Sequence, residues 1–267
     1  MDQRIPAILQ PLLREYIYRL GVEMPGRISA CYLVGSIALG AFNPRLSDID
    51  FVAVLASPAA QADFASLLNV HKQLEVHYPR WKIEGMYFQA GDLGCADDVL
   101  QPYLSYHDGR LKWSERLVLS SVTWWILKQR GIALFGPPPE TLAIRVDMDE
   151  LVRKQRENLN SYWSGWTKRP RRRLALLSDW GVEWSVLGVL RLFYTIREHD
   201  ITSKTGAGEY ALRHVPERWH AIIQEPLALR EGTGESFYRS KLKRANEAAS
   251  FLRYVIRTCN DVVGRLS

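Results

Sequence analysis

The chain has 267 residues, enough for one large or two small domains with a sizeable hydrophobic core. Its formal net charge of +6 favours an anionic partner, which a nucleoside triphosphate satisfies as well as a nucleic acid does. The three cysteines lack CxxC spacing, and we recognise neither a leader segment nor an apolar run long enough for a membrane span, so we expect a cytoplasmic protein without disulfides, a zinc site or a membrane partner.

Apolar residues recur at helical spacing over residues 4–20, which predicts an amphipathic helix ahead of the first strand. The apolar run 28–34 predicts that strand, and a second apolar run extends from Asp48 to Leu55. Glycine and proline interrupt the residues between the two runs, which predicts a tight turn, a short helix and a loop.

Residues 35–50 combine two features that carry chemistry. Gly35 lets the backbone approach a phosphate closely, and Ser36 offers a hydroxyl at the start of the short helix. Asp48 and Asp50 are two residues apart, so in a strand they point to one face, where like charges repel unless a cation neutralises them. Mg²⁺ prefers one or two carboxylates together with substrate phosphates. Each feature alone is common, but in this order they predict a metal and phosphate site.

Residues 58–78 predict a further helix, and residues 82–88 predict a third strand. Glu84 lies in the middle of this strand. It is either a solvated carboxylate at a sheet edge or a third catalytic acid, and the strand alone does not decide between the two.

The second half of the chain has a different character. A helix is predicted from residue 114 or 115 to 130, followed by a short strand at 131–136 and a rigid turn at the triple proline 137–139. Beyond this turn, periodic apolar segments with little strand character predict a helical bundle. We therefore expect an α+β domain over residues 1–145 and an all-α domain over residues 146–267.

Residues 168–173 form one dense basic run, and Trp163 and Trp166 stand just before it. Arginines beside aromatic residues suit phosphates and bases, but a solvated loop between two helices is the more common outcome. We do not expect a nucleic-acid partner from this run.

The pair Gly35-Ser36 followed by Asp48-x-Asp50 resembles the signature of the nucleotidyltransferase superfamily of DNA polymerase beta-like enzymes. Together with Glu84, the boundary at 131–137, and the segments 189–194 and 201–204, the order of features resembles the streptomycin/spectinomycin adenylyltransferases. The resemblance implies an α+β nucleotidyltransferase domain followed by a helical bundle. It also implies an enzyme that uses two Mg²⁺ ions to transfer AMP from ATP to a hydroxyl of an aminoglycoside or aminocyclitol, and we expect this enzyme to be a monomer.

Two groups of site residues follow from this resemblance. The first would bind metal or phosphate from the N-terminal domain, with the two aspartates and Glu84 on the metals and Glu84 as general base; it consists of Gly35, Ser36, Ser47, Asp48, Asp50 and Glu84. The second lies in the helical domain; Arg191 and Lys204 would face the triphosphate, and Trp166, Asp179 and Glu183 would hold a cationic aminoglycoside.

Alternatives remain open at this stage. Lys204 can instead cap a helix, and Arg191 can pair with a carboxylate. A basic insertion at 168–173 is at odds with a cleft for a polycationic drug, so another hydroxylated metabolite is also considered. The two other functional hypotheses are a toxin-like nucleotidyltransferase acting on RNA or protein, and a nucleotide-binding scaffold with an inactive site.

Overall fold

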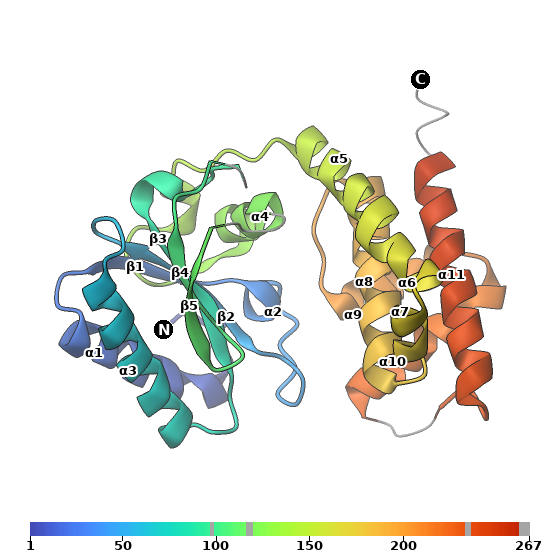
Figure 1. Cartoon of the computed structure of the whole chain (residues 1–267), viewed down its shortest axis with the longest axis horizontal. Coiled ribbons are helices and arrows are strands. Elements are labelled where there is room, and N and C mark those ends of the chain that lie inside the picture. The colour runs from blue at the N-terminus through green and yellow to red at the C-terminus, as the bar shows by residue number, and fades with distance from the viewer. Residues whose placement is uncertain (97–98, 116–119, 233–235, 262–267) are drawn as a thin grey trace. The chain divides into compact units, whose positions relative to one another are not determined.

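The computed structural model covers the whole chain, and the residues described below are 1–96, 99–115, 120–232 and 236–261. The chain divides into two compact units, Met1–Asp147 and Met148–Ser267, which we call the N-terminal unit and the helical unit and describe separately (Figure 1). None of the described helices is long and apolar enough to cross a lipid bilayer.

The N-terminal unit is built on one six-stranded sheet with the strand order β5-β4-β3-β2-β1-β6. β2 and β3 are parallel, and the other neighbouring strands are antiparallel, so the sheet is mixed. The strands are β1 (Ile28–Leu33), β2 (Ile49–Leu55), β3 (Ile83–Gln89), β4 (Tyr103–His107), β5 (Arg110–Ser114) and β6 (Ile132–Phe135). The α-helices are α1 (Gln10–Glu23), α2 (Gly35–Ala38), α3 (Gln61–His77) and α4 (Ser120–Arg130).

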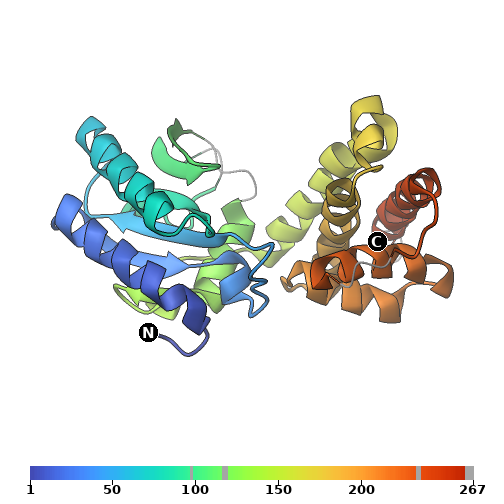
Figure 2. The same ribbon diagram turned by 90° about the horizontal axis from the view of Figure 1, so that it is seen from below.

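Helices α1 and α3 lie side by side along one face of this sheet (Figure 2). The buried residues of α1 recur at helical spacing and include Leu13, Tyr16 and Leu20. They belong to one core with Phe51 of β2 and Tyr87 of β3, whose side chains project from the covered face. α3 also forms the crossover from β2 to β3, because parallel neighbours cannot be joined by a tight hairpin.

The opposite face of the sheet is apolar at one end and polar at the other. α4 packs on its apolar end, where the ring of Trp124 lies 5.2 Å from that of Phe88. Phe88 and Glu84 are four residues apart on β3, so both project from this face. The carboxylate of Glu84, and that of Asp50 beside it, therefore stand on the part of the sheet that α1 and α3 do not cover.

The helical unit is arranged around α8, which is buried along most of its length and contacts α5, α9, α10 and α11 (Figure 1). Gly188 of α8 allows a close approach, since a Cβ atom there would lie 2.1 Å from Cη2 of Trp163. The helices are α5 (Met148–Asn158), α6 (Ser164–Lys168), α7 (Pro170–Ala175), α8 (Asp179–Glu198), α9 (Lys204–His214), α10 (His220–Glu231) and α11 (Lys241–Asp261), with a π-helical turn at Leu159–Trp163.

The predicted fold class, a mixed sheet with helices followed by a helical region, is confirmed. One predicted boundary is wrong. Ser114 ends β5 and does not begin a helix, and the helix is described from Ser120 onward as α4. Residues 116–119 of that prediction lie outside the described residues. The basic run 168–173 is also helical for the most part, because α6 ends at Lys168 and α7 begins at Pro170.

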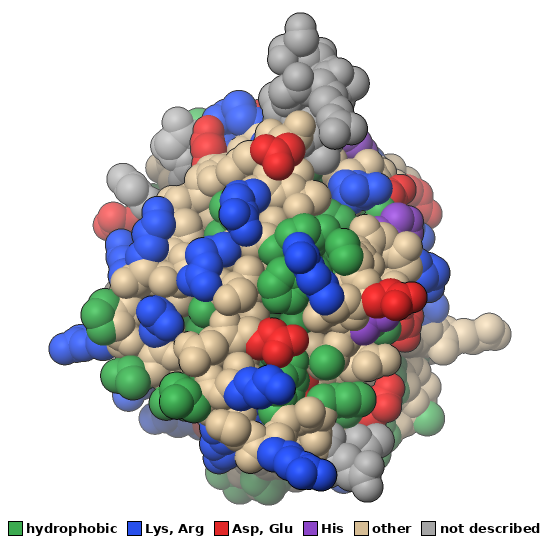
Figure 3. All heavy atoms as spheres, turned by 90° about the vertical axis from the view of Figure 1, so that its right-hand side faces the viewer, with side chains coloured by type: hydrophobic (Ala, Val, Ile, Leu, Met, Phe, Trp, Pro, Cys, Tyr) green, Lys and Arg blue, Asp and Glu red, His purple; other side chains and the backbone are tan. Residues whose placement is uncertain are grey.

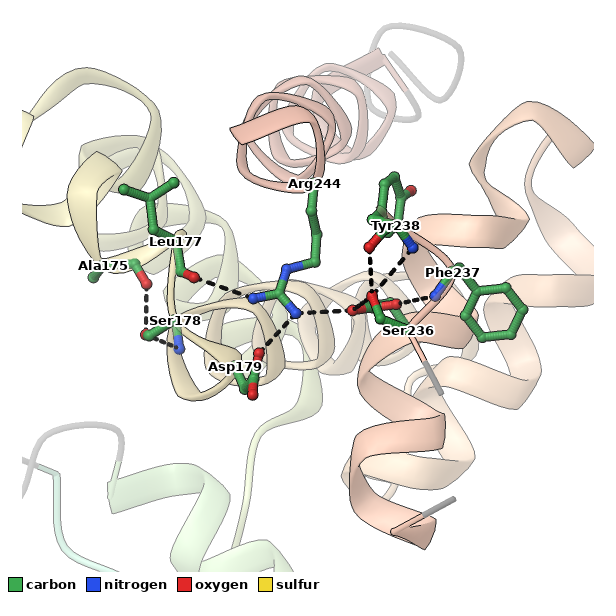
Figure 4. Close-up of polar contacts among 10 residues, drawn as sticks. Ala175, Leu177, Ser178, Asp179, Ser236, Phe237, Tyr238 and Arg244 are labelled. Atoms are coloured by element: carbon green, nitrogen blue, oxygen red, sulfur yellow. Dashed lines mark hydrogen bonds and ion pairs between the residues drawn. The ribbon is translucent and has the colours of Figure 1, made fainter. Parts of the chain in front are cut away.

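An ionic cluster in which Arg244 and Glu225 are buried and Asp179 is largely exposed joins α8, α10 and α11 (Figure 4). Nη1 of Arg244 lies 2.7 Å from Oδ1 of Asp179 and 2.8 Å from Oε1 of Glu225. Glu225, 1% exposed, also accepts hydrogen bonds from the Ser236 hydroxyl and the Phe237 N–H, each over 2.8 Å. Because every partner of the Glu225 carboxylate is a donor, its charge is compensated inside the bundle.

Replacing Arg244 with a neutral residue should show how much the burial of the Glu225 carboxylate destabilises the fold when its charge is not compensated. The change Arg244→Met keeps the length of the side chain but leaves the Glu225 carboxylate buried without its counter-charge, so we expect the free energy of unfolding to fall by about 3–5 kcal/mol. Urea unfolding followed by far-UV circular dichroism measures the loss. Arg257→Met, an exposed position on the same helix, is the matched control and should change stability by about 0.5 kcal/mol or less. Equal effects of the two changes would contradict a role for the cluster.

Candidate active site

The turn after β1 lies against the start of β2. The Val34 N–H donates to the backbone carbonyl of Asp50 over 2.9 Å, which fixes the turn beside the strand. Gly35 follows with a φ of +58°, in the left-handed region that favours glycine. A Cβ atom at Gly35 would lie 1.9 Å from Oδ2 of Asp50. The turn therefore requires glycine at position 35 for two reasons: its backbone conformation, and the space that the Asp50 carboxylate occupies.

Three carboxylates influence one another at this turn. Asp50 and Glu84 are direct partners in the parallel pairing of β2 and β3, so they project from the same face. Burial raises the pKa of Asp50 to about 7, and the negative charges of Asp48 and Glu84 add to the rise. Burial also raises the pKa of Glu84, partly offset by a hydrogen bond from the Asp108 N–H and reinforced by Asp48. A cation bound here would relieve this repulsion.

The two predicted serines occupy different environments. The Ser36 hydroxyl is buried, and it makes no hydrogen bond to any described residue. A buried hydroxyl in this condition favours a polar ligand beside it. The Ser47 hydroxyl accepts a hydrogen bond from the Asn43 N–H over 2.9 Å, which closes the loop that leads into β2. Ser36 thus fits a phosphate oxygen, while the observed contact of Ser47 is with its own loop.

The β4–β5 hairpin holds Glu84 in place. Oε1 of Glu84 accepts a hydrogen bond of 3.1 Å from the Asp108 N–H, and Oε2 contacts Nδ1 of His107. His107 pairs with Arg110, so the turn between β4 and β5 consists of two residues, Asp108 and Gly109. Both residues have positive φ, as the tight turns of β-hairpins require. Glu84, His107 and Asp108 also offer ligand atoms within 4.8 Å of one another, although His107 and Asp108 are exposed.

His107 and Asp108 are not among the site residues predicted from the sequence. One signal for them is present, since Asp-Gly between two runs of alternating residues is typical of a hairpin. The sequence does not show which carboxylate the hairpin would reach, because that depends on the pairing of β4 with β3.

A pocket of about 410 Å³ opens beside these groups, within the N-terminal unit. Its lining comes from the turn after β1, from strands β2 to β5 and from α4. Asp50 and Glu84 lie on its wall, together with polar side chains from β4 and β5. Pockets of this size commonly enclose a small ligand. A hydroxyl group on such a ligand can therefore meet the Glu84 carboxylate.

In the helical unit, Lys204 and Glu183 lie together. Nζ of Lys204 is 3.2 Å from Oε1 of Glu183, and Nη1 of Arg230 is 2.6 Å from the same oxygen. Burial lowers the pKa of Lys204, and Arg191 nearby lowers it further, while Glu183 opposes both effects. We had expected Glu183 to bind a drug and Lys204 to bind the triphosphate. The structure pairs these two residues with each other, and their roles toward a drug and a triphosphate stay predictions.

The other two predicted drug contacts, Asp179 and Trp166, also contact residues of their own unit. Asp179 pairs with Arg244 at the ionic cluster described above, although 60% of its side chain is exposed. Trp166 is 3% exposed and packs between the rings of Trp163 and Trp180, at 6.4 and 6.0 Å. Its indole therefore does not offer a face to a ligand in this structure. Trp180, 61% exposed, is the member of this aromatic cluster that does.

The basic run of α7 is partly used for packing. Arg172 donates to the Tyr162 carbonyl over 2.7 Å, and its guanidinium lies 4.4 Å from the centre of the Tyr162 ring. On the face of the protein drawn in Figure 3, Lys and Arg side chains are spread out, with Asp and Glu side chains among them. A continuous basic surface of the kind that follows a nucleic-acid backbone is not seen on that face.

Two family models match separate parts of the chain. The model described as "Nucleotidyltransferase domain" matches residues 21–87, and the model described as "Aminoglycoside adenylyltransferase, C-terminal domain" matches residues 172–257. The comparison with curated proteins gave no match. Among solved structures, spectinomycin adenyltransferase AAD(9) from Enterococcus faecialis, crystallised with ATP and spectinomycin, is similar with a TM-score of 0.67. The alignment covers 93% of this chain and 99% of that chain, at 14% sequence identity.

The close contact at Gly35 can be tested with a matched pair of glycines. Gly35 and Gly40 both have positive φ, but only Gly35 lies against a carboxylate, since a Cβ at Gly40 meets no atom within 4 Å. Gly35→Ala should displace Asp50 and weaken Mg²⁺ binding at least about tenfold, ~1.4 kcal/mol. Gly40→Ala should cost only the backbone strain, about 1–2 kcal/mol of stability, and leave Mg²⁺ binding unchanged. Titration calorimetry gives the affinities; equal losses would show that crowding of Asp50 is unimportant.

The raised pKa of Asp50 predicts a pH-dependent stability in the metal-free protein. Its folded value of about 7 exceeds its ordinary value of 3.8, so the stability that the neutral form provides is full below about pH 4 and is lost as the pH rises through 7. Asp50→Asn cannot ionise. In EDTA it should therefore melt at a higher temperature than the native chain at pH 8.5, and the difference should shrink at pH 5. Glu209→Gln, at an exposed position, is the control. A difference independent of pH would rule out the charge effect.

Proposed function

We propose, from the premise that the chain is a nucleotidyltransferase resembling the aminoglycoside adenylyltransferases, that it transfers AMP from ATP to a hydroxyl group of an aminoglycoside or aminocyclitol and releases pyrophosphate. The observation that carries the proposal is the pairing of Asp50 with Glu84 beside a glycine turn and a pocket. All of these features except part of the pocket wall fall in the matched segment 21–87.

The carboxylates suit a cation. Asp48 and Asp50 would hold the two Mg²⁺ ions, with Glu84 as the third carboxylate, because these groups repel one another when no cation is present. The buried Ser36 hydroxyl would donate to a phosphate oxygen, and Gly35 would let that phosphate approach the turn. When bound, Mg²⁺ supplies charge stabilisation for the attacking and leaving oxygens.

Glu84 is suited to act as the general base. Its pKa is raised by burial, which makes the carboxylate a better proton acceptor. The Asp108 N–H and His107 fix its two oxygens, so the group has a defined orientation. Glu84 would take the proton of the acceptor hydroxyl as that oxygen bonds to the α-phosphorus and the bond to pyrophosphate breaks.

The basic residues of the helical unit would bind the triphosphate of ATP. Nζ of Lys204 and Nη1 of Arg230 both lie beside Oε1 of Glu183, and Arg191 is near enough for its charge to lower the pKa of Lys204. Such a group favours a polyanion such as ATP. The Asp179 carboxylate and the Trp180 indole are exposed. We therefore propose these two residues, in place of Trp166 and Glu183, as contacts of the acceptor.

One assay tests the function directly. The protein is incubated with ATP, Mg²⁺ and, separately, a panel of aminoglycosides and aminocyclitols, transfer RNA and a protein mixture, and mass spectrometry follows the gain of one AMP unit. We expect modification within the antibiotic panel and none of RNA or protein. Modification of RNA or protein alone would replace our proposal with the alternative acceptor class.

The role of Glu84 has its own expected outcome. Glu84→Gln keeps the shape of the side chain and removes its basicity, so kcat should fall by roughly a hundredfold or more while ATP affinity changes little. Glu75→Gln is the matched control, since Glu75 bonds the Tyr106 hydroxyl on the far side of β4 and its amide can still accept that bond. Lost ATP binding with normal turnover at saturation would show that Glu84 positions the nucleotide and is not the base.

A further inference from the structure

The pocket beside Glu84 has a floor whose chemistry the strand register determines. Met86 of β3 pairs with Ser105 of β4, and Ser105 pairs with Lys112 of β5, so these three side chains stand in one row across the sheet. All three line the pocket. Glu84 precedes Met86 by two residues and projects from the same face.

Lys112 lies two strands away from Glu84. Neighbouring strands are separated by about 4.8 Å, so the backbones that carry these two residues are roughly 10 Å apart across the sheet. A ring-sized acceptor whose hydroxyl reaches Glu84 consequently extends along the floor toward Lys112.

The charge of Lys112 is not cancelled locally. Among the described residues, Lys112 takes part in no ion pair. Its neighbours in the pocket wall, Ser105 and Ser114, share a hydrogen bond of 2.8 Å between their hydroxyls. The two carboxylates of the lining, Asp50 and Glu84, and the imidazole of His107 lie at the opposite end, while the other titratable groups of the lining are the phenols of Tyr103 and Tyr106. The end of the pocket away from the carboxylates is therefore cationic.

We propose that Lys112 selects the acceptor by charge, admitting a hydroxylated ring that carries no ammonium group on the side facing β5 and disfavouring acceptors that carry one there. The inference rests on the proposed function, because it assigns the pocket to the acceptor. The inference restricts the proposed acceptors to those aminoglycosides and aminocyclitols whose hydroxyl-bearing ring presents an uncharged or anionic edge to Lys112.

Binding measurements on three variants test this selection. The variants are Lys112→Gln, Lys112→Glu and the control Arg110→Glu, which makes the same change of charge two residues along β5 at a position that does not line the pocket. The probes are spectinomycin, a dication, and the same compound with both amines acetylated, which is uncharged. Titration calorimetry without ATP gives the dissociation constants.

Lys112→Glu should bind spectinomycin about tenfold more tightly than the native chain does, ~1.4 kcal/mol, because a repulsive charge becomes an attractive one. Lys112→Gln should lie between the two. The acetylated compound should bind all variants within about twofold, and Arg110→Glu should resemble the native chain with both probes. A gain in affinity cannot arise from misfolding, so this outcome is specific to the charge.

Several results would overturn the inference: unchanged spectinomycin binding in Lys112→Glu, an equal gain in Arg110→Glu, an equal gain with the uncharged probe, or no binding by any variant. The proposed function fails in a different way. If the native chain transfers AMP to no antibiotic, yet Lys112→Glu binds the dication tightly and Arg110→Glu does not, the pocket selects by charge as inferred and only the acceptor class or the reaction is wrong.

Discussion

The N-terminal unit depends on one steric and electrostatic constraint, the placement of the Asp50 carboxylate against the Cα of Gly35. The strand β2 that carries Asp50 is buried nearly throughout, and burying an ionised carboxylate near the start of such a strand ordinarily costs free energy. The glycine turn admits the carboxylate, and the parallel partner β3 adds Glu84 beside it. The local repulsion is thus built into the fold, and a bound cation would convert it into a binding interaction.

Much of this arrangement could be predicted from the sequence because its signals are local. Gly35 and Ser36 follow an apolar run, and Asp48 and Asp50 open another, so the strand, turn and strand order is visible within a short segment. Glu84 is a weaker case. Its strand is predictable, but its position beside Asp50 depends on the parallel pairing across the α3 crossover, and only the family resemblance pointed to it.

The contacts of the predicted residues in the helical unit could not be foreseen from the sequence, for a physical reason. Asp179, Glu183 and Trp166 follow from the family resemblance and suit a cationic ligand, yet acids and tryptophans equally suit ion pairs and cores. The partners that decide between these uses, Arg244 and Arg230, come from α11 and α10, far along the chain. Spacing within one helix cannot reveal such partners. The hairpin residues His107 and Asp108 escaped notice similarly, since their role depends on the strand next to them.

The position of the Asp108-Gly109 turn determines which substitutions the N-terminal unit can accept. β5 is an edge strand, so the β4–β5 hairpin is attached to the sheet along one side only, while the glycine turn follows β1, an inner strand of the sheet. The hairpin supplies both the donor that orients Glu84 and the lysine at the far end of the pocket. Substitutions at the exposed positions of this peripheral segment can therefore change the chemistry at the far end of the pocket without altering the glycine turn or the pairing of β2 with β3.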